Sequence, residues 1–311
     1  MSEREIVCAD FDRAIDDLKR EGFRLDVIYP ADEPYSAVLS RGGERVRVTS
    51  RPDASLIPSR LPPFVPEFVL TRAEGAPVQG RAGMLYRDLI PSRLGGRYIA
   101  SHIAIPDGGP VADWVHYHRI ALQLIYVARG WVRVVYEDQG DPFVMNPGDF
   151  VLQPPEIRHR VLESSPGLEV VEVTAPALHE TFADHEMQLP NGLDVARTFG
   201  RQRFLRHMAE RTPWTPFGGG EAQESALEEA TGGLAQLRTV RPDGSQPITF
   251  EPHDDELVFG YLLEGSAGLG CGPEFALEAG AAFVIPPSES WSLAAPSADF
   301  RLLHLTVAGL P

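Results

Sequence analysis

The chain has 311 residues, of which 43% are hydrophobic, and it carries a formal net charge of −16 at pH 7. This length allows two or three domains, and the acidic balance argues against nucleic-acid and anionic-membrane partners, which require basic surfaces. The two cysteines, Cys8 and Cys271, fit no metal or redox spacing. The N-terminus lacks the apolar segment of a signal peptide, and no stretch approaches about 18 apolar residues. We therefore expect a cytoplasmic protein without disulfides.

Residues 1–50 predict a small α+β unit. Asp10 can cap a helix that ends near Gly22 and has one apolar face. That face is formed by Phe11, Ala14, Ile15 and Leu18. Strands are expected at 24–29, 35–39 and 45–49. This βαβββ order and the segment FDRAIDDLKREGFRLDVIY resemble one module of the glyoxalase/vicinal-oxygen-chelate superfamily. The ligand pattern of the metal-binding members is missing here, so we expect a structural module whose open sheet packs on a partner sheet or dimerises.

Residues 51–84 form a proline-rich arm that is too apolar for a free linker. Its apolar residues are Leu61, Phe64, Val65, Phe68 and Val69. We expect the arm to lie against a barrel or a second subunit. Together with the open sheet of the first module, it predicts a homodimer.

Residues 85–175 contain the motifs that carry chemistry. A strand at 97–105 places Ile99, Ile103 and Ile105 on one face and Tyr98 and His102 on the other. His116 and His118 then point to one side of the next strand, because strand side chains alternate. Gln123 follows, and His159 comes after a Pro-Gly-Asp turn and a Pro-Pro pair.

These motifs resemble those of the cupin superfamily, which comprises small antiparallel β-barrels with a metal inside. The first motif is matched by Gly109, His116, His118, Gln123 and Gly130, and the second by Gly148, Pro154, Glu156, His159 and Glu163. Gln123 replaces the usual glutamate, and Glu156 and Glu163 replace a glycine and an asparagine. The resemblance implies a metal-binding barrel in residues 85–175.

The predicted metal ligands are His116, His118, His159 and Gln123, which together would hold one divalent metal per chain. Gln123 could instead orient a histidine or a bound water rather than bind the metal. Iron(II) is favoured by the resemblance, and zinc, nickel, manganese and copper are also compatible with neutral imidazoles.

His102 and Arg158 are the candidate catalytic residues. Arg119, Arg158 and Arg160 could meet a small, anionic substrate, because a guanidinium pairs well with a carboxylate. The alternative for each arginine is a solvated position at a strand end. His102 and Tyr98 could line the barrel or serve as packing residues, whereas Tyr117 should point outside.

Residues 176–215 predict a connector with helical character around 195–211, and residues 216–311 predict a second barrel that repeats the first. Aligning Gly265 with Gly130 places Glu251, His253 and Val258 at the positions of His116, His118 and Gln123. Trp291 takes the place of His159. We expect this second barrel to bind no metal and the indole of Trp291 to fill its interior.

The chain thus predicts a mainly β fold with two tandem cupin (jelly-roll) barrels after a small α+β module. A two-barrel cupin with metal only in the first barrel resembles the gentisate-type ring-cleaving dioxygenases. The resemblance implies a non-haem iron dioxygenase acting on a small hydroxylated aromatic or enolic acid. Two alternatives stay open: a redox-silent metal-dependent isomerase, lyase or hydrolase, and a metal-dependent small-molecule binding or regulatory protein.

Overall fold

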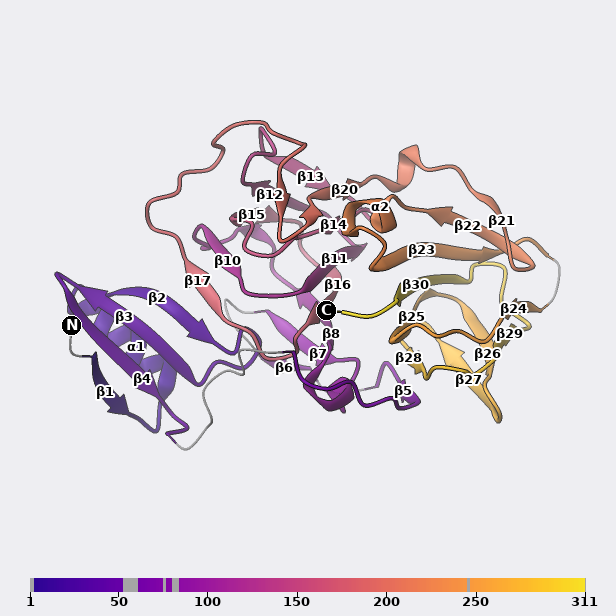
Figure 1. The fold of residues 1–311 in the computed structure, drawn as a ribbon, viewed down its shortest axis with the longest axis horizontal. Helices are drawn as coiled ribbons and strands as arrows, with labels where there is room; N and C mark the ends of the chain where they lie inside the picture. The colour runs from indigo at the N-terminus through magenta and orange to yellow at the C-terminus, as the bar shows by residue number, and fades with distance from the viewer. Residues whose placement is uncertain (1–2, 53–60, 75–76, 80–83, 245–246, 311) are drawn as a thin grey trace.

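The computed structural model of the chain describes residues 3–52, 61–74, 77–79, 84–244 and 247–310. The fold is mainly β, as predicted, and Figure 1 shows three parts in a row: an N-terminal module, a first barrel and a second barrel. Within these described ranges, no helix is long and apolar enough to cross a membrane.

The N-terminal module has the predicted βαβββ order. Its elements are β1 (Glu3–Val7), α1 (Phe11–Arg20), β2 (Arg24–Tyr29), β3 (Ser36–Arg41) and β4 (Glu44–Thr49). Asp10 caps α1, since its side chain accepts a hydrogen bond from the backbone N–H of Arg13 at 3.0 Å. Phe11, Ile15 and Leu18 are buried against the sheet, which is the apolar face read from the sequence.

One edge of this module's sheet, strand β2, pairs with another strand of the same chain, while β1 forms the other edge. Strand β2 pairs with β17 (Thr181–Ala183), and β17 pairs on its other side with β10 (His116–His118). The module and part of the first barrel therefore form one continuous sheet, in the order β1-β4-β3-β2-β17-β10-β15-β12-β13. Pairing with β17 hides a strand edge that would otherwise be free to pair with another chain.

The first barrel consists of two facing sheets. Within the barrel, the longer of the two sheets has seven strands. In spatial order they are β20 (Leu205–His207), β14 (Phe150–Leu152), β11 (Leu122–Arg129), β16 (Leu168–Ala175), β8 (Ile99–Ile105), β7 (Leu85–Asp88) and β6 (Val78–Gln79). The other contains β10, β15 (His159–Ser164), β12 (Val132–Tyr136) and β13 (Phe143–Met145), with β9 (Gly109–Pro110) paired to β15. A 3₁₀ turn, η2 (Arg93–Gly96), precedes β8.

The second barrel repeats this arrangement strand for strand. Its longer sheet runs β21 (Thr215–Phe217), β22 (Gly220–Glu224), β23 (Ala235–Pro242), β30 (Arg301–Val307), β25 (Leu257–Glu264), β28 (Ala282–Ile285) and β5 (Val69–Thr71). Its shorter sheet runs β24 (Ile248–Phe250), β29 (Trp291–Ala294), β26 (Ser266–Gly270) and β27 (Glu274–Glu278). A short helix, α2 (Leu227–Thr231), precedes β23. The internal repeat predicted from the sequence is thus present at the level of topology.

Each long sheet is completed by a strand from outside its own barrel segment. Strand β5 comes from the arm and pairs with β28, while β20 comes from the connector and pairs with β14. The arm also supplies β6, which pairs with β7 of the first barrel, so it lies against both barrels. Phe68 of the arm stacks on Phe275 of the second barrel with ring centroids 5.1 Å apart. Leu61 and Phe64 pack against the core that the barrels share.

The prediction of helical character around 195–211 is wrong. This connector contains β18 (Thr198–Phe199), β19 (Gln202–Arg203) and β20, followed by a 3₁₀ turn, η3 (Ala209–Arg211). The backbone of β20 hydrogen-bonds to β14, so pairing with a distant strand overrides the local helical preference.

The two long sheets pack face to face and share one hydrophobic core, which includes Leu122 and Phe150 from the first barrel and Phe259 and Leu305 from the second. An ion pair closes this interface. Arg97 donates to both carboxylate oxygens of Glu256 at 2.7 and 2.9 Å, and the hydroxyl of buried Tyr98 donates to the same carboxylate at 2.6 Å.

Candidate metal centre

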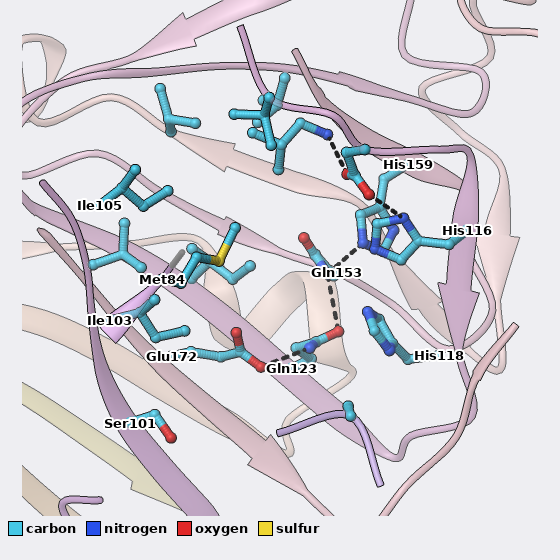
Figure 2. A pocket seen from close by; sticks show the side chains of 18 of the residues that line it. Met84, Ser101, Ile103, Ile105, His116, His118, Gln123, Gln153, His159 and Glu172 are labelled. Carbon is cyan, nitrogen blue, oxygen red and sulfur yellow. Dashed lines mark hydrogen bonds and ion pairs between the residues drawn. The ribbon is translucent and has the colours of Figure 1, made fainter. Parts of the chain in front are cut away.

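Three histidines converge inside the first barrel. His116 and His118 lie two residues apart on β10, and His159 begins β15 directly opposite His116 in the ladder. All three side chains are buried, and one nitrogen from each lies within 4.8 Å of the others. Figure 2 shows the three rings at one end of a cavity. The period-two alternation of strands explains why His116 and His118 point to the same side.

For His116 and His159, the hydrogen bond at Nδ1 defines which nitrogen the ring can offer to a metal. His116 Nδ1 lies 2.8 Å from the carbonyl oxygen of Trp114, and His159 Nδ1 lies 3.0 Å from that of Ile157. A carbonyl only accepts, so Nδ1 carries the proton and Nε2 is the basic nitrogen. His118 Nδ1 lies 3.1 Å from the hydroxyl of Thr181 on β17. Three such imidazoles fit a divalent first-row metal, because a ligating histidine usually donates its other N–H to a fixed partner.

A chain of polar side chains, all buried except the half-buried Glu172, runs beside the histidines. The hydroxyl of Tyr136 donates to Gln153 Oε1 at 2.6 Å, and Gln153 Nε2 donates to Gln123 Oε1 at 2.9 Å. Gln123 Nε2 then donates to Glu172 Oε1 at 2.9 Å, and the hydroxyl of Thr174 donates to the same oxygen at 3.1 Å. An amide Nε2 only donates and an amide Oε1 only accepts, so the orientations of Gln123 and Gln153 set the direction of the bonds in the chain.

This chain bears on the role of Gln123. Its carbonyl oxygen accepts from Gln153, whose amide nitrogen lies 3.4 Å from His159 Nε2. The arrangement favours the second of the two predicted roles, in which Gln123 positions a neighbouring group. Ligation by Gln123 stays a prediction, since a carbonyl oxygen has a second lone pair.

The cavity has a volume of about 150 Å³. Alternate residues of four strands face it, as the strand period requires. They include Ile99, Ser101, Ile103 and Ile105 on β8, Gln123 and Ile125 on β11, Val132, Val134 and Tyr136 on β12, and Leu168, Val170 and Glu172 on β16. In Figure 2, Met84, Ile103 and Ile105 lie across the cavity from His116 and His118. The site therefore combines a polar end with an aliphatic end.

The structure does not bring the two predicted catalytic residues to this cavity. His102 lies on the opposite face of β8, where its Nε2 is 3.1 Å from Glu169 and its ring stacks on Tyr261 of the second barrel. Burial lowers the pKa of His102 more than Glu169 raises it. Tyr98 shares this face and is fully buried between the barrels, so the packing alternative holds for both residues.

The three arginines are also absent from the cavity lining. Arg158 Nε donates to Asp184 at 3.0 Å, and its guanidinium lies 4.2 Å from the ring centroid of Tyr117. Tyr117 itself stacks on Phe182, outside the barrel as predicted. Arg119 lies over the ring of Phe182, and Arg160 has a buried Nε atom. All three alternate away from the side of the strand that carries the histidines.

Several residues that line the cavity belong to neither of the two sequence motifs. Gln153, Tyr136 and Glu172 could have been found by asking which polar residues share the inward period of their strands. His179 lines the cavity with its ring edge-on to His118, its Nδ1 atom 3.1 Å from the carbonyl oxygen of Pro176, and its pKa lowered by burial. Asp32 reaches the cavity from the N-terminal module, a placement that no local sequence signal contains.

The second barrel has aromatic residues at the equivalent place. Phe250 lies opposite Trp291 in the β24–β29 ladder, as His116 lies opposite His159, and the two rings stack with centroids 3.6 Å apart. The counterpart of His116 is therefore Phe250, whereas the sequence alignment chose its exposed neighbour Glu251. The second barrel has one more residue between Phe250 and Gly265 than the first barrel has between His116 and Gly130, and this shifts the register. Trp291 is 4% exposed and belongs to the barrel core, as expected.

Residues 101–174 match the family model described as Cupin domain. The first barrel contains a cupin domain. The matched segment includes the three histidines and the polar chain from Gln123 to Thr174, whereas Asp32 and His179 lie outside it. Among curated proteins, none matches the sequence.

Solved structures similar to this chain include salicylate 1,2-dioxygenase from Pseudaminobacter salicylatoxidans, with a TM-score of 0.59 and 17% identity over 80% of this chain and 86% of that chain. A putative glyoxylate-induced protein from Pseudomonas aeruginosa has a TM-score of 0.58 and 13% identity over 83% and 96%. Protein Ylba from E. coli has a TM-score of 0.56 and 11% identity over 80% and 94%. These likenesses extend beyond the cupin domain, and they are likenesses of fold. The glyoxalase-like resemblance of the N-terminal module stays a prediction.

Proposed function

We propose that the cupin domain is the active site of a non-haem iron dioxygenase that acts on a small hydroxylated aromatic or enolic compound. The observation that carries the proposal is the convergence of three imidazoles, with one nitrogen from each within 4.8 Å of the others, at the end of a partly aliphatic cavity. Three neutral ligands leave coordination positions for a substrate and for dioxygen. The likeness of fold to salicylate 1,2-dioxygenase supports the same class of reaction.

Iron(II) would be held by His116, His118 and His159 and would supply the one-electron chemistry that dioxygen requires. The protein groups have simpler roles. The partners of the three Nδ1 atoms fix the ring orientations, and the polar chain holds Gln153 beside His159. The aliphatic wall excludes bulk water from the reacting groups.

The second barrel and the N-terminal module are proposed to support this site without chemistry of their own. Phe250 and Trp291 fill the space that two histidines occupy in the first barrel. The module contributes a strand edge to β17, which carries the Thr181 partner of His118. We regard the whole as a two-barrel cupin with a single metal centre.

The test is metal analysis followed by oxygen uptake. The purified protein is analysed for bound metals, reloaded with iron(II) without oxygen, and then mixed with single-ring phenols and enols in an oxygen electrode. Iron together with substrate-dependent uptake that His116→Ala abolishes supports the proposal. Zinc without uptake supports a redox-silent enzyme, and binding without turnover supports a regulatory protein; either result contradicts the dioxygenase.

A further inference from the structure

The charged residues that line the first-barrel cavity are acidic. They are Asp32, Asp113 and Glu172, and none of the described lining residues is a lysine or an arginine. Asp113 accepts backbone N–H groups of Trp114 and Val161, both at 2.9 Å.

Asp32 comes from the loop between β2 and β3 of the N-terminal module. Its Oδ2 atom accepts a hydrogen bond from Arg93 at 2.8 Å, while its Oδ1 atom is buried without a partner among the described residues. Arg93 is also 3.5 Å from Asp88, so this guanidinium is shared between two carboxylates. The module therefore places an incompletely paired carboxylate at the cavity.

The charges decide which ligands the cavity favours. In formal charges, a divalent metal held by the three imidazoles would contribute +2 and the three lining carboxylates would contribute −3, which would leave −1. One of these carboxylates, Asp113, lies 3.4 Å from Nδ1 of His116. Including Arg93 and Asp88 adds +1 and −1 and leaves this sum unchanged. A ligand carboxylate would meet net repulsion in a buried site, where charges are weakly screened. This repulsion is the reverse of what the predicted arginines would have provided.

The size and the wall of the cavity restrict the ligand further. A volume of about 150 Å³ is comparable to that of a cavity that binds benzene, so a single ring or a short chain fits. The wall opposite the histidines is aliphatic, with Ile103, Ile105, Val170 and Met84 among its members. Such a surface gains free energy from contact with an apolar group and offers no partner to an ionic one.

We propose that the first-barrel cavity selects an uncharged ligand of about one ring that carries two neighbouring oxygen atoms, and that Asp32 of the N-terminal module disfavours carboxylates. This inference rests on the metal-centre function proposed above. It assigns the module a part in specificity and narrows the predicted substrate from an acid to a neutral phenol or enol.

The test compares two ligands of the same shape, 2-hydroxyacetophenone and salicylate, which share a ring and an ortho hydroxyl and differ in a methyl ketone against a carboxylate. The full-length protein is loaded with zinc, which binds oxygen ligands without oxygen chemistry, and both ligands are titrated at pH 7 by calorimetry. We expect the neutral ketone to bind at least about tenfold more tightly. Equal or tighter binding of salicylate, or no binding of either ligand, overturns the proposal.

Asp32→Asn tests whether the charge of Asp32 causes the preference for the neutral ketone over salicylate. We expect it to narrow the gap between the two ligands roughly threefold or more, whereas Glu33→Gln, an equal charge change at the exposed neighbouring position, leaves the gap unchanged. An unchanged gap in folded Asp32→Asn contradicts the role of Asp32, and the comparison in the unaltered protein stands if that variant fails to fold.

Oxygen uptake by the iron-loaded protein separates this inference from the proposed function. Preferential binding of the ketone without uptake would contradict the dioxygenase and leave the selectivity intact. Tight binding of salicylate with uptake would contradict the selectivity and leave the dioxygenase intact.

Discussion

The two barrels share one topology and differ in what fills them. Each long sheet has seven strands in the same order, and each short sheet has the same four-strand core. In the first barrel, His116 and His159 face each other across two strands, and in the second Phe250 and Trp291 do so. The scaffold therefore accepts either a polar site or an apolar core, and the interior side chains decide which one forms.

The same turn in each barrel requires a glycine. Gly130 and Gly265 have φ angles of 73° and 76°, a region that side chains other than glycine rarely adopt. A Cβ atom would lie 2.4 Å from Ser165 Oγ at the first and 2.3 Å from Ser297 Oγ at the second. The turn thus needs glycine in both barrels, whereas the ligand positions have no such backbone constraint.

The largest effect is expected from Trp291→Ala. The indole is buried among Phe250, Phe283 and His304, so its removal should lower the free energy of unfolding by about 3–5 kcal/mol. The equivalent change in the first barrel, His159→Ala, should abolish metal binding instead. Urea unfolding monitored by circular dichroism measures the first effect, and metal analysis the second. If Trp291→Ala costs less than about 1 kcal/mol, the second barrel is not a packed core.

The contact that joins the barrels should rank next. Arg97→Ala leaves the carboxylate of Glu256, whose side chain is 13% exposed, without its ion-pair partner. Burial raises the pKa of Glu256, but the hydrogen bonds from Arg97 and Tyr98 together outweigh this effect. The pKa of Glu256 therefore lies below its usual value, and the carboxylate stays ionised. We expect a loss of about 3 kcal/mol in the free energy of unfolding. Arg129→Ala, which removes an exposed arginine near Glu169, is the control and should cost less than about 1 kcal/mol.

Thr181→Val tests the support that β17 gives to the metal centre. The change removes the hydroxyl that lies 3.1 Å from His118 Nδ1 and nearly preserves the shape of the side chain. Loss of such a partner should weaken metal binding roughly 10- to 100-fold. Competition with a chelator measures the affinity. A metal affinity in Thr181→Val equal to that of the wild type would show that β17, through Thr181, does not orient His118.

Acid should destabilise the second barrel through His304, the counterpart of Glu172 in the strand register. Burial lowers the pKa of His304 to about 3, so the folded state keeps it neutral while the unfolded state protonates it near pH 6.5. Its contribution to stability is complete above pH 6.5 and is lost as the pH falls toward 3, by up to about 1.4 kcal/mol per pH unit. Urea midpoints of His304→Leu between pH 7 and 4 should fall less steeply than those of the wild type. An equal slope would contradict this assignment.

The sequence predicted the architecture well because the repeated glycine turns and the strand periods are local signals. The βαβββ unit, the histidine trio and the repeat could all be read from them. The placement of His102 could not, because alternation shows only that it opposes Ile103, not which face of β8 meets the second barrel. The position of Asp32 at the cavity could not be predicted either, because it depends on how the N-terminal module packs against the first barrel. The homodimer and the cytoplasmic location stay predictions.

The most direct test of the account is the number of metal ions per chain. The three-histidine site predicts about one equivalent by elemental analysis after reconstitution and desalting, the same value in His253→Ala, and nearly none in His116→Ala. Circular dichroism should show that both variants remain folded. About two equivalents in the wild type, or full occupancy in His116→Ala, would contradict a single metal centre in the first barrel.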